Sequence, residues 1–332
     1  MNRKIGMVVL LLLAVVLVFP GCSSEPSAPS PTAPSVSPVT GATEVPAEKV
    51  TLKIGSLPRI FDLIAYAAER DGIFEKHNLD VEIVSFRSTV EMNNALLVGE
   101  LDGSIQGTFE AVNLNKEGEN AKLVGHNFMP RMFEVVASQS SGITSADQLK
   151  GKEVATGTGT IMEYAMDELL RAQGMAGKDV NYVNVPNIAL RVEMLNQGKV
   201  PVAVLTSPTS DLAVMNGARI ILDDAEQLLG GPGLIFSIGA LNSKSDGIDR
   251  FVKAWKETVD LINASPREYH SLLIDVARVP EQVASSLAVP VFPKLRLPEE
   301  VELKSITDWM IEKGLMIEPV PYDRVVETKY LD

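Results

Sequence analysis

Hydrophobic and polar positions alternate between two periods from residue 50 to residue 206. Short β-prone runs span residues 50–56, 79–86 and 102–107. Between the first two runs, apolar Ile60, Ile64 and Ala67 recur at helical spacing before Gly72. Strands that alternate with helices predict an α/β fold with a mainly parallel sheet.

The same plan returns in the next part of the chain. Its β-prone runs span residues 151–157, 180–186 and 200–206. In both parts a helical segment ends at a glycine before the third strand, as in NNALLVGELDGSIQG and RVEMLNQGKVPVAVLT. Two similar α/β units in tandem predict two lobes that face each other.

Several predicted helices begin with a residue that can cap them. These residues are Ser88, Thr160, Asn187 and Ser207. Ser88 and Thr160 are each followed three residues later by glutamate, which is the capping-box pattern. Ser207 precedes a proline, which suits the first helical position. Helix starts present free N–H groups and a partial positive charge, so they can bind an anion or a hydrogen-bond acceptor.

A glycine-rich turn joins a strand to a helix in EVATGTGTIMEYAMDELL, residues 153–170. A P-loop requires a lysine at the end of the turn, and no lysine follows Gly159 until Lys178. A dinucleotide fingerprint requires a third glycine where Met162 stands. The turn is therefore either a loop that lets a ligand approach the backbone closely or a plain tight turn.

The composition predicts a globular protein large enough for two lobes. The 332 residues are 45% hydrophobic and 22% charged. The formal net charge is −13, whereas nucleic-acid binding rests on clustered Lys and Arg. Nucleic acid is therefore not expected as a partner, although net charge says little about a small ligand.

The N-terminus resembles the signal sequence of a bacterial lipoprotein. Arg3 and Lys4 precede an apolar run at residues 5–19, which is short for a membrane span. Cys22, the only cysteine, stands where the lipid is attached, although the residues three and two positions before it are unusual. We expect a signal peptide at 1–21, with an uncleaved membrane anchor as the alternative. Either places the rest of the chain in the periplasm or on the outer face of the cytoplasmic membrane.

Residues 22–49 are rich in Ser, Pro, Thr and Ala and are expected to form a disordered tether behind the lipidated Cys22. With that cysteine lipidated, no thiol remains for disulfides, nucleophilic catalysis or metal binding. The three histidines lie far apart in the sequence. We therefore expect neither a metal nor a cofactor.

Four segments recur in order along the chain from about residue 49 onward: KIG (53–55), AERDGIFEKHNLDVEIV (68–84), NALLVGELDGSIQG (94–107) and SADQLKGKEVATGTGT (145–160). In these segments the chain resembles the substrate-binding proteins of ABC importers in the nitrate/sulfonate/taurine and thiamine-precursor (hydroxymethylpyrimidine) group. It implies a two-lobed periplasmic-binding-protein clamp of type II with two crossing strands, at 133–140 and 234–241. Lobe one would then comprise residues 50–138 and 238–332, and lobe two residues 139–237.

Ligands of open α/β sheets lie outside the carboxyl ends of the strands, so we expect the site in the loops that follow the predicted strands. The candidate ligand-binding residues are Arg59, Phe61, Arg87, Ser88, Thr89, Gln106, Thr108, Glu110, Gly157, Thr158, Gly159, Thr160, Asn187, Thr206 and Ser207. Arg59 and Arg87 can pair an anionic ligand by a bidentate fork. Glu110 and Asp62 favour a cationic or amino-bearing ligand, and Phe61 can stack on a flat one. The charge of the ligand stays open.

Each of these residues also has a structural explanation. Capping alone accounts for Ser88 and Thr160, and Glu110 suits the first turn of a helix. Both arginines can equally be solvated surface residues. Arg191 lies inside a predicted helix and is expected to be exposed, and His126 is the only histidine placed near the site.

The leading hypothesis is an extracytoplasmic solute-binding protein. We do not expect an enzyme, because the sequence contains no nucleophile elbow and no zinc helix signature. It would act as a monomer, anchored through Cys22, and deliver a small molecule to an ABC permease driven by an ATPase. One alternative is an enzyme on the same fold, of the menaquinone or thiamine-pyrimidine biosynthesis type, against which the signal sequence and single cysteine argue. Another is a sensor subunit that presents its ligand to a receptor.

Overall fold

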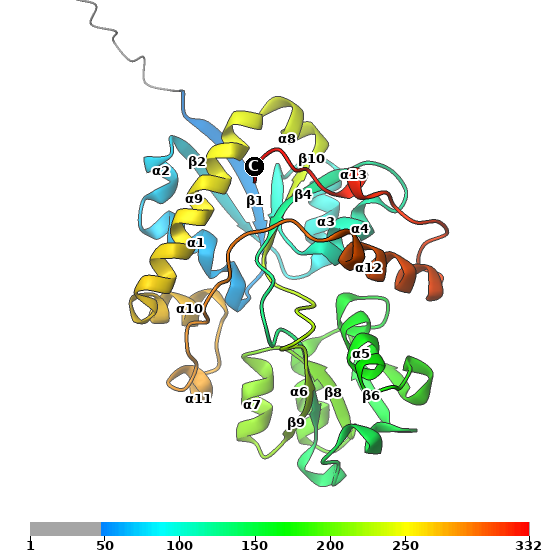
Figure 1. Cartoon of the computed structure of the whole chain (residues 1–332). Helices are drawn as coiled ribbons and strands as arrows, with labels where there is room; N and C mark the ends of the chain where they lie inside the picture. The colour runs from blue at the N-terminus through cyan, green and yellow to red at the C-terminus, as the bar shows by residue number, and fades with distance from the viewer. Residues whose placement is uncertain (1–47, 332) are drawn as a thin grey trace, which may run out of the picture. The chain divides into compact units, whose positions relative to one another are not determined.

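The computed structural model describes residues 48–331, which contain two five-stranded sheets (Figure 1). The first sheet has the strand order β2-β1-β3-β10-β4. Its strands are β1 (Val50–Ser56), β2 (Leu79–Ser85), β3 (Gly103–Ile105), β4 (Ala121–His126) and β10 (Gly233–Ser237). Strands β2, β1 and β3 are parallel, and β10 is antiparallel to β3 and β4.

The second sheet repeats this plan with the order β7-β6-β8-β5-β9. Its strands are β5 (Glu134–Ala137), β6 (Glu153–Thr156), β7 (Asn181–Asn184), β8 (Val202–Leu205) and β9 (Arg219–Asp223). Strands β7, β6 and β8 are parallel, and β5 is antiparallel to β8 and β9. The predicted two-lobed α/β fold is confirmed.

Helices cover both faces of the first sheet because both faces are apolar. One face packs against α1 (Leu63–Arg70), α2 (Ile73–Lys76), α9 (Ser245–Ala264) and α10 (His270–Val276). The other packs against α3 (Thr89–Leu97), α4 (Thr108–Asn115), α12 (Glu300–Glu312) and α13 (Tyr322–Val325). The fully buried Trp255 and Trp309 belong one to each of these two packed clusters.

The second sheet is covered in the same way. Helix α5 (Ile161–Ala172) packs on one face, and α6 (Ile188–Asn196) and α7 (Thr209–Met215) pack on the other. Helix α8 (Ile238–Ser243) follows β10, and α11 (Glu281–Ala284) contacts α7. Single 3-10 turns occur at η1 (Ile60–Asp62), η2 (Gln139–Ser141), η3 (Ala146–Leu149), η4 (Gly177–Asp179) and η5 (Pro266–Tyr269).

The chain changes sheet just before β5 and just before β10. The expected boundaries at 138/139 and 237/238 lie after these strands, because the sequence does not show which sheet a crossing strand joins. A buried carboxylate ties the two crossings together: Asp224 Oδ1 accepts from the Phe133 N–H (2.9 Å), and Oδ2 accepts from the Leu229 N–H (3.2 Å). Burial raises the pKa of Asp224 to about 6.

Three of the four predicted helix caps are present. Ser88, Thr160 and Asn187 each accept a backbone N–H with the side-chain oxygen. The prediction for Ser207 is wrong, because α7 has Pro208 at its N-cap and the Ser207 hydroxyl donates to the carboxylate of Asp211. A serine one residue earlier cannot reach the first free N–H groups of the helix.

Within residues 48–331, none of the helices combines the length and the apolar character that crossing a membrane requires. The expected signal peptide, Cys22 and nearly all of the tether lie outside the described residues.

Candidate functional site

In lobe one, Arg59 follows β1 and is held by the buried Asp62. Its Nε donates to Asp62 Oδ2 (2.8 Å), and its Nη2 donates to the carbonyl of Ile105 (2.6 Å). The guanidinium carbon also lies 4.3 Å from the ring centroid of Phe61. Arg59 therefore fastens the loop after β1 to the loop after β3, and much of its donor fork is used within the protein.

Glu110 lies in the first turn of α4 and is partly buried. Burial raises the pKa of its carboxyl, while Arg59 and the N–H groups of Gly107 and Glu110 oppose the rise. Burial also raises the pKa of the Asp62 carboxyl, and Arg59 opposes that rise too. One guanidinium thus acts on the pKa values of both carboxyl groups.

Gln106 and Thr108 support this loop from below. Both are buried, and Gln106 Nε2 donates to Asn93 Oδ1 (2.7 Å) and to Ser104 Oγ (3.0 Å). The Thr108 hydroxyl bonds His126 Nδ1 (2.9 Å), and His126 Nε2 bonds the carbonyl of Gly231 (3.0 Å). Burial lowers the pKa of His126 to about 4, so the ring is neutral and donates to that carbonyl.

The start of α3 stands apart from this cluster. Arg87 is exposed and forms no ion pair within residues 48–331. Ser88 and Thr89 are partly buried, and the Ser88 oxygen accepts from the Glu91 N–H (3.2 Å). Of the two candidate arginines, only Arg87 keeps its guanidinium free of protein partners.

In lobe two, the polar groups of the glycine-rich loop after β6 form hydrogen bonds within the protein. The Thr158 N–H donates to Asn184 Oδ1 (3.1 Å), and the Gly159 N–H donates to Glu163 Oε2 (2.7 Å). The Thr160 hydroxyl donates to the carbonyl of Gly157 (2.6 Å). Gly159 has φ +72°, which explains the glycine. Two N–H groups expected to meet a ligand are therefore used internally.

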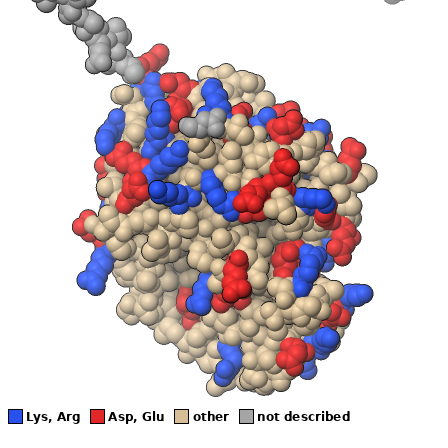
Figure 2. Space-filling model, viewed as in Figure 1, with Lys and Arg blue, Asp and Glu red and all other residues tan. Residues whose placement is uncertain are grey.

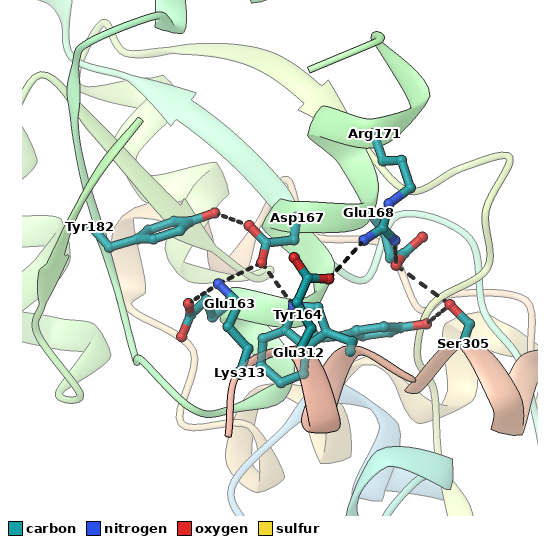
Figure 3. A network of polar contacts seen from close by, with 10 residues as sticks. Glu163, Tyr164, Asp167, Glu168, Arg171, Tyr182, Ser305, Glu312 and Lys313 are labelled. Atoms are coloured by element: carbon teal, nitrogen blue, oxygen red, sulfur yellow. Dashed lines mark hydrogen bonds and ion pairs between the residues drawn. The ribbon is translucent and has the colours of Figure 1, made fainter. Parts of the chain in front are cut away.

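Glu163 also links this loop to the other lobe, as Figure 3 shows. Its Oε1 lies 2.6 Å from the ammonium of Lys313, which follows α12. Burial lowers the pKa of Lys313, but its hydrogen bonds to the carboxylates of Asp167 and Glu163 outweigh this effect and raise the pKa. Beyond the lysine, Leu315 Cδ2 lies 3.6 Å from the position that a Cβ on Gly159 would take. The loop is thus set against the C-terminal part of lobe one.

The α5–α12 bridge is formed by Glu163, Tyr164 and Asp167 of α5, by Trp309 of α12 and by Lys313 just after α12. Figure 3 shows Glu163, Tyr164, Asp167 and Lys313. Asp167 Oδ2 accepts from Trp309 Nε1 (2.7 Å) and from Lys313 (2.8 Å), and Oδ1 accepts from the hydroxyl of Tyr182. The rings of Tyr164, Trp309 and Phe109 contact one another, with centroids 5.6 Å apart for Tyr164–Trp309, 5.9 Å for Tyr164–Phe109 and 5.8 Å for Phe109–Trp309. Because Phe109 lies in the first turn of α4, the ring contacts bring the starts of α4 and α5 together.

Arg191 was expected to be exposed, and that prediction is wrong: only 1% of the residue is accessible. It lies in the first turn of α6, where Nη1 donates to the carbonyl of Val204 (2.5 Å) and Nη2 to that of Pro186 (3.4 Å). The Nε has no hydrogen-bond partner, and no carboxylate pairs the guanidinium within the described residues. Burial lowers the pKa of Arg191 to about 10, so it stays charged at neutral pH.

The remaining lobe-two candidates surround Arg191. Asn187 is exposed and caps α6, and its oxygen accepts from the Leu190 N–H (3.0 Å). Thr206 and Ser207 are partly buried, and the Thr206 carbonyl accepts from the Thr209 hydroxyl (2.6 Å). The carboxyl ends of β6, β7 and β8 thus bring the predicted lobe-two loops together at one edge of the sheet.

Two cavities lie away from these loops. One, of about 560 Å³, is lined on lobe one by Lys53, Glu82, Glu100, Asp102 and Lys244 among others, and one of about 170 Å³ lies at the opposite end of lobe two, near Gln139 and Asn196. Figure 2 shows basic and acidic residues interspersed over the viewed face, so this face has no single acidic patch. Among residues 48–331, no group of three or more His, Cys, Asp or Glu is arranged to hold a metal ion.

The chain belongs to the NMT1/THI5-like family, whose model matches residues 63–269. This match bears out the resemblance to this group of binding proteins. A putative ABC transporter periplasmic binding protein of Brachyspira hyodysenteriae is 28% identical over 240 residues, which cover 66% of this chain and 67% of that protein. A putative thiamine biosynthesis protein of Haemophilus influenzae is 28% identical over 118 residues, or 36% of this chain and 38% of that protein.

Solved structures share the fold at low sequence identity. The periplasmic aliphatic sulphonate binding protein SsuA from Escherichia coli superposes with a TM-score of 0.71 at 18% identity, covering 84% of this chain and 92% of that chain. The desulfurization enzyme DSZB superposes with a TM-score of 0.65 at 13% identity, covering 85% and 97%. The fold therefore serves both binding and catalysis.

Sequence reasoning missed the residues that organise the loops. Glu163 carried a signal, since it stands at the glutamate position of the predicted capping box. Asp167 and Lys313 carried none, because their pairing joins positions far apart in the chain. Arg191 was considered, but an arginine on a helix usually faces solvent.

Proposed function

We propose that this chain is the solute-binding subunit of an ABC importer, and that it holds a small molecule between the loops at the carboxyl ends of its two sheets. The observation that carries the proposal is the contact between Phe109 and Tyr164, which brings the first turns of α4 and α5 together across the lobes. Membership of the NMT1/THI5-like family and the name of the Brachyspira relative support it.

The proposed site consists of two groups of loops. Lobe one contributes Arg59, Phe61, Arg87, Ser88, Thr89, Gln106, Thr108 and Glu110; lobe two contributes Gly157, Thr158, Gly159, Thr160, Asn187, Thr206 and Ser207. Of these, the partly buried Phe61 and Glu110 and the exposed Arg87 and Thr158 retain side chains open to a ligand. Buried Gln106 and Thr108 act by holding the loop in place.

The remaining parts of the proposal rest on the N-terminal sequence. A lipid on Cys22 would anchor a monomer outside the cytoplasmic membrane, next to a permease and its ATPase. The binding protein would release its solute unchanged. An enzyme on this fold remains the competing function, because the desulfurization enzyme DSZB has the same architecture.

Native mass spectrometry of the full chain in mild detergent tests the proposal. The protein is incubated with the fraction below 1 kDa of a rich growth medium, and bound mass and melting temperature are compared before and after dialysis. One saturable adduct that leaves chemically unchanged supports binding, and a ligand at 100 times its Kd adds about 2.7 kcal/mol of stability. Conversion of the adduct to a new mass would instead support the enzyme.

A further inference from the structure

Helix α5 of lobe two contacts helix α12 of lobe one from its first turn to its last, as Figure 3 shows. In the first turn, the hydroxyl of Tyr164 donates to Ser305 Oγ (3.1 Å). In the last turn, Nη2 of Arg171 lies 3.8 Å from the carboxylate of Glu312. Because α5 begins directly after the 157–160 loop, this interface between the lobes borders the proposed site.

The apolar part of the interface belongs to both lobes. Tyr164 is buried in a cluster with Phe109 and Trp309, and all other buried members of that cluster are residues of lobe one. Ala165 and Leu169 of the same helix are buried in the cluster that includes strand β8 of lobe two. Separating the lobes would expose the rings of Tyr164 and Trp309 to water, and this cost opposes opening.

The charged part of the interface divides its ions between the lobes. Lobe two supplies Glu163 and Asp167, two buried carboxylates four residues apart on α5, where like charges repel. Lobe one supplies the cation, since Lys313 Nζ lies 2.6 Å from Glu163 Oε1 and 2.8 Å from Asp167 Oδ2. Within residues 48–331, no other Lys or Arg pairs with either carboxylate. Each lobe therefore needs the other to balance these charges.

One carboxylate connects the interface to the glycine-rich loop. While Oε1 of Glu163 binds Lys313, its Oε2 accepts from the Gly159 N–H (2.7 Å). Leu315, two residues after the lysine, lies 3.6 Å from the position that a Cβ on Gly159 would take. A movement of Lys313 away from lobe two would thus remove two supports of the loop that we propose contacts the solute.

Every contact described above joins two groups of the chain itself, so the interface needs no solute to form. Resting on the proposed solute-binding function, we propose that the α5–α12 bridge is a latch that holds the lobes closed before a solute arrives. Lys313 must part from Glu163 and Asp167 each time a solute enters or leaves. The lysine is a positioning residue, because it acts through Glu163 and the glycine-rich loop and does not contact the solute.

Fluorescence quenching of the dialysed full chain in mild detergent tests the latch without any solute. The chain has two tryptophans, of which Trp309 lies in the bridge and Trp255 is buried in the other cluster of lobe one. Trp255→Phe leaves Trp309 as the sole fluorophore, and the difference from the two-tryptophan protein gives the signal of Trp255. We expect acrylamide to quench Trp309 slowly in this background and much faster once Lys313→Met is added, whereas Trp255 stays shielded.

Three further variants complete the comparison. Lys304→Met is the matched control, because Lys304 pairs with Asp308 on the exposed face of α12, and it should leave Trp309 shielded. Lys313→Arg keeps the charge and should retain most of the shielding. Glu163→Gln removes one ion pair but keeps an acceptor for the Gly159 N–H, and it should expose Trp309 partially. Circular dichroism verifies folding, and Glu163→Gln carries the test if Lys313→Met does not fold.

Two results of the quenching experiment would overturn the latch. If Trp309 is as accessible in the parent background as in Lys313→Met, the bridge does not hold the solute-free lobes together. If Trp309 and Trp255 become accessible together, the variant loosens lobe one instead of parting the lobes.

Exchange of the growth-medium adduct, followed by native mass spectrometry, gives a second readout. Because capture and release both pass through the open state, Lys313→Met should raise both rates by a similar factor, roughly 10-fold or more, and change the Kd little. A faster release with unchanged capture would mean that the lobes close only around the solute, and the latch would be wrong. If the medium gives no adduct, the proposed function fails, and quenching of Trp309 still decides whether the bridge holds the lobes.

Discussion

Arg59 and Arg191 occupy opposite lobes of the proposed site and have opposite surroundings. Arg59 is partly exposed and paired with a fully buried carboxylate. Arg191 is almost fully buried and has only carbonyl oxygens as partners. The partly exposed Arg59 is therefore neutralised by a carboxylate, whereas the buried Arg191 has no carboxylate partner among residues 48–331.

The contrast is between a charge that forms an ion pair within the fold and a charge that forms none. Asp62 cannot lose Arg59 without leaving a carboxylate buried and unpaired, so that pair belongs to the fold. Arg191 has two carbonyl acceptors and no carboxylate partner among residues 48–331, so its charge is not part of an ion pair there. The two lobes have similar topology, yet they contribute to the site by different means.

The α5–α12 bridge connects lobe two to lobe one. Breaking it should lower the free energy of unfolding more than any other change considered below. In Asp167→Ala, Lys313, Trp309 Nε1 and the Tyr182 hydroxyl lose a shared buried acceptor. We expect unfolding in urea to require about 3–5 kcal/mol less free energy. Asp308→Ala is the control, because Asp308 pairs with Lys304 on the exposed face of α12 and should cost at most about 1 kcal/mol. Equal losses in both variants would mean that the bridge contributes no more than a surface ion pair.

The free energy of unfolding should depend on pH through His126 of lobe one. Its pKa is about 4 in the folded protein against 6.5 when unfolded, so the neutral ring stabilises the fold fully above pH 6.5. As the pH falls from 6.5 to 4, the unfolded chain takes up the proton first, and about 3 kcal/mol of this stabilisation is lost.

His126→Gln keeps one donor and one acceptor and has no proton to gain, so its unfolding free energy should depend less on pH over this range. Asp224 acts in the opposite direction, because its raised pKa stabilises the fold as the pH falls from about 6 toward 3.8. It is present in both proteins, so the difference between their denaturation curves isolates His126. Parallel pH profiles would show that the ring is not held neutral.

Replacing each arginine by methionine tests the comparison directly. Arg59→Met leaves Asp62 without its cation and should cost about 2–3 kcal/mol, less than the roughly 3–5 kcal/mol of a fully buried pair, because Arg59 is partly exposed. Arg191→Met removes an unpaired buried charge at the expense of two hydrogen bonds, and it should change stability by no more than about 1 kcal/mol. Urea denaturation of both variants measures the difference, and a larger loss in Arg191→Met would reverse the contrast.

The sequence predicted the layers of this molecule well and its site unevenly. Apolar periodicity and capping residues are local, so the strands, most helix starts and the duplicated plan could be derived from them. The pairings Arg59–Asp62 and Glu163–Gly159 are also local, within four residues, but the predicted capping box would have paired Glu163 with the Thr160 N–H instead of the Gly159 N–H. The contacts of Asp167 with Trp309 and of Arg191 with Val204 depend on tertiary packing. No spacing along the chain indicates that an arginine on α6 turns inward.

The smallest change in stability is expected at the helix caps Ser88 and Thr160, which again compare one residue from each lobe. Ser88 only accepts, from the Glu91 N–H (3.2 Å), whereas Thr160 accepts from the Met162 N–H (3.2 Å) and also donates to the Gly157 carbonyl (2.6 Å). Ser88→Ala should therefore cost about 0.5–1 kcal/mol and Thr160→Ala about 1–2 kcal/mol. Thermal unfolding measures both, and Thr160→Ser is the control that should retain most of the stability. If Thr160→Ala costs no more than Ser88→Ala, the hydroxyl does not hold the glycine loop, and that loop would have to owe its shape to Glu163 and Asn184 alone.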